Sequence, residues 1–79
     1  MRFLHVSLSS VRMMDTYTRM IRSNFPEEEH RFLYCDEVGG EDRRLLEYGN
    51  SKEVMGSLRQ RFRTICEEFD AADYIIWHG

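Results

Sequence analysis

The apolar residues of this chain alternate between two spacings, and this alternation restricts the fold more than any other feature of the sequence. Short apolar runs that suit buried strands lie at 3–8, 30–35 and 74–77. Between them, apolar residues recur every three or four positions over 11–24 and 51–69, which predicts two amphipathic helices. Strands that alternate with long helices form a parallel sheet through right-handed crossovers. The sequence therefore predicts an α/β fold, a Rossmann-like three-layer unit with three or four parallel strands.

Local signals indicate where the elements begin. Ser9 and Ser10 follow the first strand, and a serine hydroxyl there can cap the first helix. Asn50 precedes Glu53 by three positions, a spacing close to that of a capping box, so the second helix is predicted to begin at 51. The apolar segment 45–48 is interpreted as a short edge strand, with an irregular link as the alternative.

The same patterns predict which parts of the fold are central. We expect the strands at 3–8 and 74–77 to lie in the middle of the sheet. Phe62 lies in the middle of the apolar stripe of the second helix, with Leu58 and Ile65 at helical spacing on either side. The spacing predicts that Phe62 is a core residue.

Length and composition limit the domain organisation and the class of protein. A chain of 79 residues has room for one domain, here 1–79, and its net charge of −3 argues against a nucleic-acid partner. No apolar run approaches the length of about 18 residues that a membrane-spanning helix needs. Cys35 and Cys66 are interpreted as reduced thiols, which predicts a cytoplasmic protein.

The last strand leads to the strongest candidate for chemistry. Parallel sheets bind ligands beyond the carboxyl ends of their strands, and this strand ends in His78 and Gly79. Imidazole titrates near neutral pH, so His78 is the candidate catalytic residue, with a structural histidine as the alternative. Gly79 leaves room for a ligand, and Ser9 with Ser10 offers helix N-terminal donors, although a simple N-cap also explains the serines. His5 is interpreted as a buried structural residue.

Other side chains give weaker signals. The sequence contains no glycine-rich dinucleotide fingerprint, no Walker motif and no metal-ligand spacing, so we expect no metal and no cofactor. Arg12, Arg19 and Arg22 share one side of the first helix. They are interpreted as a solvated face, and peripheral contact with anionic lipid at the inner face of the plasma membrane is the alternative. His30 follows an acidic turn and is predicted to lie on the surface.

Four stretches together resemble a known family: Phe3-Leu4-His5-Val6 before a polar turn, a helix ending at Asn24-Phe25, the strand 30–34, and the terminal Ile75-Ile76-Trp77-His78-Gly79. They are similar to the amino-terminal domain of GT-B glycosyltransferases. Within that group they are most similar to the bacterial 4-alpha-L-fucosyltransferases, which are lipid II N-acetylfucosaminyltransferases.

The resemblance implies a function that depends on a second domain. It implies two Rossmann-like domains across a cleft, no obligatory metal, a nucleotide-sugar donor on the carboxyl-terminal domain and a lipid-linked or glycan acceptor on this one. His78 would then be catalytic, and Ser9, Ser10 and Gly79 would line the cleft; an inverting and a retaining mechanism both stay open. This chain would be a fragment that is inactive alone. The alternative is a stand-alone, non-catalytic α/β binding module, and in either case we expect its open sheet edge to form a homodimer.

Overall fold

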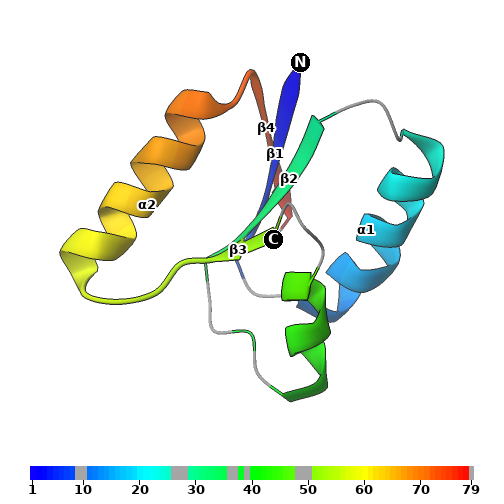
Figure 1. Cartoon of the computed structure of the whole chain (residues 1–79), viewed down its shortest axis with the longest axis horizontal. Helices are drawn as coiled ribbons and strands as arrows, with labels where there is room; N and C mark the ends of the chain where they lie inside the picture. The colour runs from blue at the N-terminus through cyan, green and yellow to red at the C-terminus, as the bar shows by residue number, and fades with distance from the viewer. Residues whose placement is uncertain (9–10, 26–28, 36–37, 39, 48–50, 79) are drawn as a thin grey trace.

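The computed structural model of the chain describes residues 1–8, 11–25, 29–35, 38, 40–47 and 51–78. Its elements, in chain order, are β1 (Arg2–Ser7), α1 (Val11–Asn24), β2 (Glu29–Tyr34), the 3-10 helix η1 (Gly40–Glu47), β3 (Ser51–Glu53), α2 (Leu58–Ala71) and β4 (Tyr74–His78). The four strands form one parallel sheet (Figure 1). The predicted α/β class, with a parallel sheet and two helices, is confirmed.

The order of the strands in the sheet is β3-β2-β1-β4. The chain moves in one direction from β1 to β3 and then returns over the sheet to place β4 on the other side of β1. Helices α1 and η1 cover one face, and α2 lies over the other, which gives three layers compatible with a Rossmann-like unit (Figure 1). The prediction that the last strand is central was wrong: β1 and β2 are the inner strands, and β4 is an edge.

The face under α1 and η1 holds the larger apolar core. Alternate residues of each strand point to this face, so Phe32 and Tyr34 of β2 project toward the helices. Met14 of α1 and Leu45 of η1 are fully buried against the same cluster. Leu45 therefore packs from a 3-10 helix, and the prediction of an edge strand at 45–48 was wrong. Residues 48–50 lie outside the described residues.

The face under α2 is covered less completely. Its buried residues come from the strands and the segment after β3, namely Leu4, Val6, Leu33 and Val54. Only the carboxyl-terminal half of α2, with Ile65 and Phe69, packs against them. Phe62 is 70% exposed, so its predicted place in the core was wrong. Helical spacing shows that apolar residues share a face, but it does not show how much of that face the sheet covers.

Helix α2 begins seven residues later than the sequence predicted, because a second capping sequence forms the cap. Ser57 Oγ accepts a hydrogen bond from Gln60 N at 3.2 Å, and Ser57 N donates to Gln60 Oε1 at 2.7 Å. The backbone of Gly56 has φ +97°, and a Cβ added there would collide with Gln60 Oε1. Glycine therefore permits both the turn and the cap, and 51–53 is free to pair as β3.

Candidate functional site

One row of side chains crosses the whole sheet at its carboxyl edge. In the register of the sheet, Glu53 of β3 is the neighbour of Tyr34, Tyr34 is the neighbour of Ser7, and Ser7 is the neighbour of His78. Residues in one row of a parallel sheet point to the same face, which here is the face under α1 and η1. This row brings a carboxylate, a phenol, a hydroxyl and an imidazole to the edge where parallel sheets bind ligands.

His78 occupies the position in that row that best suits a ligand site. It ends β4, directly beside the end of β1. β1 is followed by α1 on one face and β4 is preceded by α2 on the other, so the strand order reverses between these two strands. Its carbonyl oxygen accepts a hydrogen bond from Leu8 N at 3.3 Å, so the pairing of β1 and β4 continues to the last described residue. In open α/β sheets this reversal of strand order leaves a crevice between the two strand ends.

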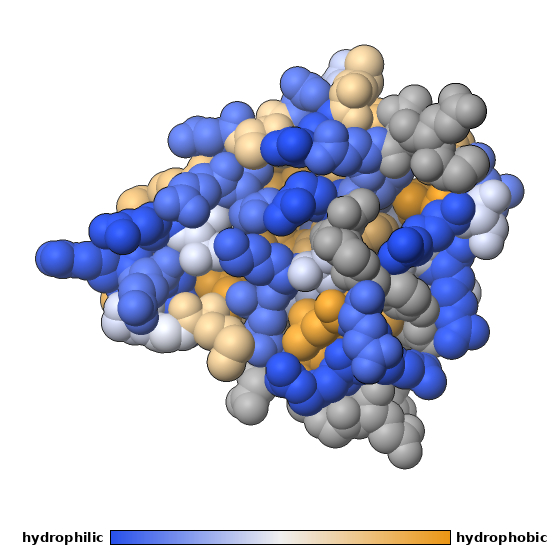
Figure 2. All heavy atoms as spheres, in the orientation of Figure 1, coloured by the Kyte–Doolittle hydropathy of each residue, from blue (hydrophilic) through white to orange (hydrophobic). Residues whose placement is uncertain are grey.

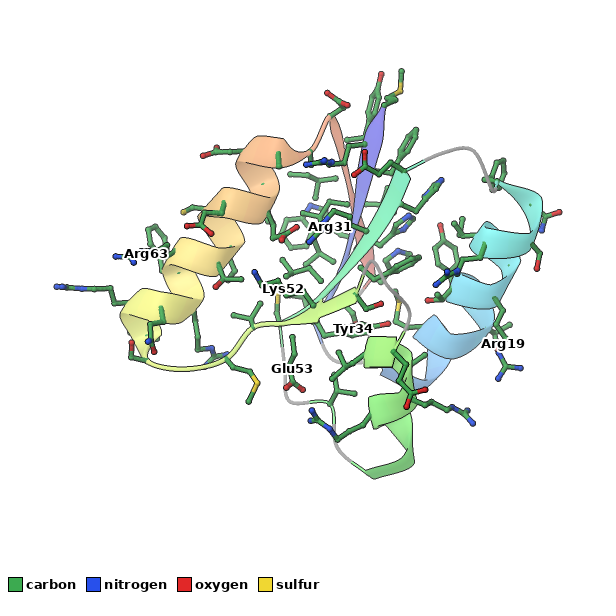
Figure 3. All side chains as sticks on the ribbon, viewed as in Figure 1. Arg19, Arg31, Tyr34, Lys52, Glu53 and Arg63 are labelled. Carbon is green, nitrogen blue, oxygen red and sulfur yellow. The ribbon has the colours of Figure 1, made fainter. Side chains whose placement is uncertain are left out.

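The opposite end of the row is a structural contact. The Glu53 side chain is buried at the end of β3, and its Oε2 accepts a hydrogen bond from Val38 N at 2.7 Å. The guanidinium of Arg43 lies 3.6 Å from the same oxygen and donates to the carbonyl oxygen of Val38 at 2.9 Å. These bonds hold Val38 against the end of β3, so Glu53 acts here as an anchor and not as a base. Figure 3 shows Glu53 pointing away from α2.

His78 is also the outer member of a chain of three imidazole rings. His5 Nδ1 lies 3.1 Å from His78 Nε2, and His5 Nε2 lies 2.8 Å from His30 Nδ1. Tyr17 of α1 packs edge-on against both His5 and His78, with ring centroids 5.4 and 4.5 Å away. Phe32 stacks on His5 at 4.7 Å. The three rings come from β4, β1 and β2, and aromatic neighbours hold them on the α1 face.

Burial keeps His5 and His78 neutral at physiological pH. His5 is completely buried, and desolvation, together with the charges of His30 and His78, lowers the pKa of His5 to about 4. Desolvation also lowers the pKa of His78. A neutral imidazole has one unprotonated nitrogen, so His78 is able to accept a proton at pH 7.

Among the described residues, no group of three histidine, cysteine or acidic side chains could hold a metal ion. The three imidazoles do not form such a group because each nitrogen of His5 already faces a nitrogen of another ring. A shallow hollow lined by Met1, Asp73 and Tyr74 lies at the opposite, amino end of the sheet, away from His78.

The structure places the predicted site residues as follows. His78 lies at the carboxyl edge as expected, while Ser9, Ser10 and Gly79 lie outside the described residues. His5 is buried, as predicted. His30 is half-buried and bonded to His5, so its predicted surface position was wrong.

Arg19 and Arg22 are exposed on α1. Figure 3 shows Arg19 pointing away from the sheet. The structure gives no side-chain position for Arg12, so the predicted cluster of three arginines is described only in part.

The chain of three histidines is the feature of the candidate site that the sequence does not predict. His5 and His78 are 73 residues apart, and His5 and His30 are 25 apart. Alternate residues of a strand point to opposite faces of the sheet, and in each of these strands the histidine occupies a position that faces α1. Combining the three signals requires the strand order and register, which the sequence patterns do not fix.

Comparison of the chain with protein-family models, curated proteins and solved structures finds no match. Among the described residues, none of the helices has the length and apolar character that crossing a membrane requires.

Proposed function

We propose that this chain forms the acceptor-binding side of a glycosyltransferase, in which His78 takes the proton from the acceptor hydroxyl group. The observation that carries the proposal is the position of a neutral imidazole at the carboxyl end of β4, beside the reversal of strand order. A positioned base of this kind is what a hydroxyl nucleophile needs at pH 7. The resemblance of the sequence to GT-B enzymes supports a sugar as the transferred group.

The proposed reaction is a group transfer to oxygen. The acceptor oxygen forms a bond to the anomeric carbon of a nucleotide sugar, and the bond from that carbon to the diphosphate oxygen breaks. The electron pair of the broken bond leaves with the nucleoside diphosphate, and the hydroxyl proton passes to His78. The donor would bind on a second domain, and the acceptor, a glycan or a lipid-linked sugar, would bind over the carboxyl ends of β1 and β4.

The test is the variant His78→Ala in a polypeptide that joins this domain to its donor-binding domain. Loss of the base should lower turnover by about 10²-fold or more, while the melting temperature changes little because His78 lies at the rim of the sheet. Trp77→Ala is the matched control: Trp77 is the preceding residue of β4, points to the opposite face and is 58% exposed. Full turnover in a correctly folded His78→Ala protein would exclude His78 from the reaction.

A second function, a non-catalytic interaction module, is favoured by a different observation. Tyr74, Ile75 and Trp77 of the edge strand β4 are all exposed, and an exposed apolar edge is suited to pairing with another strand. A second copy of the chain could pair through its own β4. Charged and polar groups dominate the face visible in Figure 2.

Sedimentation distinguishes this second function from the first. A dimer at high protein concentration that Ile75→Lys converts to a monomer would support pairing through β4. A monomer at millimolar concentration would contradict it.

A further inference from the structure

Two hydrogen bonds join the three histidines in a line, and both bonds must run in the same direction along it. His5 is the middle ring, and both of its nitrogens face nitrogens of neighbouring rings, at 3.1 Å toward His78 and 2.8 Å toward His30. A neutral imidazole carries one N–H and one lone pair. His5 must therefore donate in one direction and accept in the other, so the tautomers of the three rings are coupled.

Two neutral arrangements satisfy both contacts. In the inward arrangement, His78 donates from Nε2 to His5 Nδ1, His5 donates from Nε2 to His30 Nδ1, and the Nδ1 lone pair of His78 is free to act as a base. In the outward arrangement, both hydrogen bonds run the other way, and His78 carries its proton on Nδ1. Only the inward arrangement prepares His78 to take a proton.

We propose that His78, His5 and His30 form a proton relay that accepts a single proton at His78 Nδ1 and passes its charge inward to His30. This proposal rests on the proposed function, because the acceptor hydroxyl group would supply the proton. His5 would act as a positioning residue, because it sets the tautomer of His78 and does not itself contact the substrate.

The transfer balances at every nitrogen. When His78 Nδ1 gains the proton, the proton on His78 Nε2 moves to His5 Nδ1, and the proton on His5 Nε2 moves to His30 Nδ1. His78 and His5 are then neutral, both hydrogen bonds are kept with reversed direction, and the positive charge lies on His30. Return of the proton to water through His78 Nδ1, after the products leave, restores the inward arrangement.

The relay holds one added proton and no more. A second proton would place hydrogens on both nitrogens that face each other in one of the two contacts, and that contact would have to break. The rings that contact His5 are the other two imidazoles, Phe32 and, from α1, Tyr17. Within this aromatic enclosure a broken contact leaves a buried N–H without a partner, which is costly.

The first experiment reads the relay directly by ¹⁵N NMR of the histidine rings in the unmodified chain. Scalar coupling between His5 Nδ1 and His78 Nε2, and between His5 Nε2 and His30 Nδ1, is expected across the two hydrogen bonds at pH 8. On acidification, the three rings should report one shared midpoint and the uptake of one proton. Three independent midpoints, or no coupling across either contact, would overturn the relay.

The matched variant is His5→Phe, which keeps an aromatic ring between Phe32 and Tyr17 but removes both central nitrogens. In this variant His78 and His30 should titrate separately, and the folded chain should take up two protons where the parent takes up one. Tyr17→Phe is the control, since it keeps the edge-on ring and should retain the single shared midpoint. Uptake of one shared proton by a folded His5→Phe protein would contradict the role of His5.

The relay and the proposed function fail in different ways. Intact coupling between the rings, with full turnover in His78→Ala, would keep the relay and exclude the transferase base. Independent titration of the three rings, with turnover lost in His78→Ala, would exclude the relay and keep the base. If both hold, His5→Phe should lower kcat by roughly tenfold or more and broaden the acid limb of its pH profile, with KM unchanged.

Discussion

The two faces of the sheet differ in how completely they are covered. On the α1 face, side chains from α1, β2 and η1 form one buried cluster, and His5, Ser7 and Thr18 are buried with them. On the α2 face the strands and the segment after β3 supply the buried residues of the cluster, and α2 has none of its own. Leu58 and Phe62, in the first half of α2, are exposed.

The imidazole rings lie on the closely covered face, whereas exposed apolar residues lie on the less covered face and along β4. Burial on the α1 face lowers the pKa values of His5 and His78, so both imidazoles are neutral near pH 7. The α2 face, together with β4, leaves apolar residues exposed where another strand or domain could cover them. The asymmetry suggests that the two faces have separate roles.

Truncating one phenylalanine on each face should give the sharpest contrast. Phe32 is 2% exposed within the α1-face cluster, so Phe32→Ala should lower the free energy of unfolding by roughly 3–5 kcal/mol. Phe62→Ala, on the open half of α2, should change it by less than about 0.5 kcal/mol. Urea denaturation of both variants measures the difference, and equal losses would show that α2 is as closely packed as α1.

Acid should weaken the α1 face through His5. Its pKa falls from 6.5 to about 4 on folding, so the unfolded chain binds the proton more tightly than the folded chain does. The stabilising effect is therefore complete above pH 6.5 and is lost as the pH falls toward 4, by about 3 kcal/mol in total. Urea midpoints between pH 7 and 5 should fall more steeply for the parent than for His5→Phe. Parallel curves would contradict the buried, neutral state of His5.

On the α2 face, an ion pair should contribute more than its neighbours on the helix. Arg31 of β2 donates from Nε and Nη2 to the two carboxylate oxygens of Glu68, both at 2.9 Å, and points toward α2 (Figure 3). Glu68→Ala removes a bidentate, partly buried partner and should cost about 1–3 kcal/mol. Glu67→Ala, at the adjacent exposed position, is the control. An equal effect of the two variants, measured by thermal unfolding, would show that α2 does not depend on this contact.

The smallest of these effects should come from the helix cap. Ser57→Ala removes the acceptor of the Gln60 N–H group and should cost about 1 kcal/mol of stability. Ser23→Ala, at an exposed position near the end of α1, should have almost no effect. Hydrogen exchange should show earlier opening of the first turn of α2 in Ser57→Ala. Unchanged exchange there would indicate that the capping box is not what starts the helix.

Elements with strong local signals were predicted well. The period of the apolar residues gave α1 at its observed bounds, and the apolar runs gave β1, β2 and β4 to within a residue or two at each end. The wrong predictions concern segments whose secondary structure is determined by tertiary packing. Ser51–Glu53 is too short and polar to show a strand period, and its pairing with β2 determines its structure.

The candidate site was predicted only at its outermost residue. His78 was identified because chain order alone puts it at the end of a strand. The roles of His5 and His30 depend on which strands are neighbours and on their register, and both are set by contacts between distant parts of the sequence. A local pattern shows that a residue faces inward, but not which side chain it meets.

The position of β1 has a consequence for biosynthesis. β1 leaves the ribosome before the other three strands, yet it needs a neighbour on each side, and the backbone N–H of Arg2 bonds to an Asp73 side chain 71 residues later. Its pairing with β2 can form while the rest of the chain is still being made, but its other edge stays open until β4 emerges. Through that interval the nascent chain exposes an unpaired inner strand. We therefore expect a chaperone that shields extended apolar segments to bind this protein during translation, and to release it once β4 has docked.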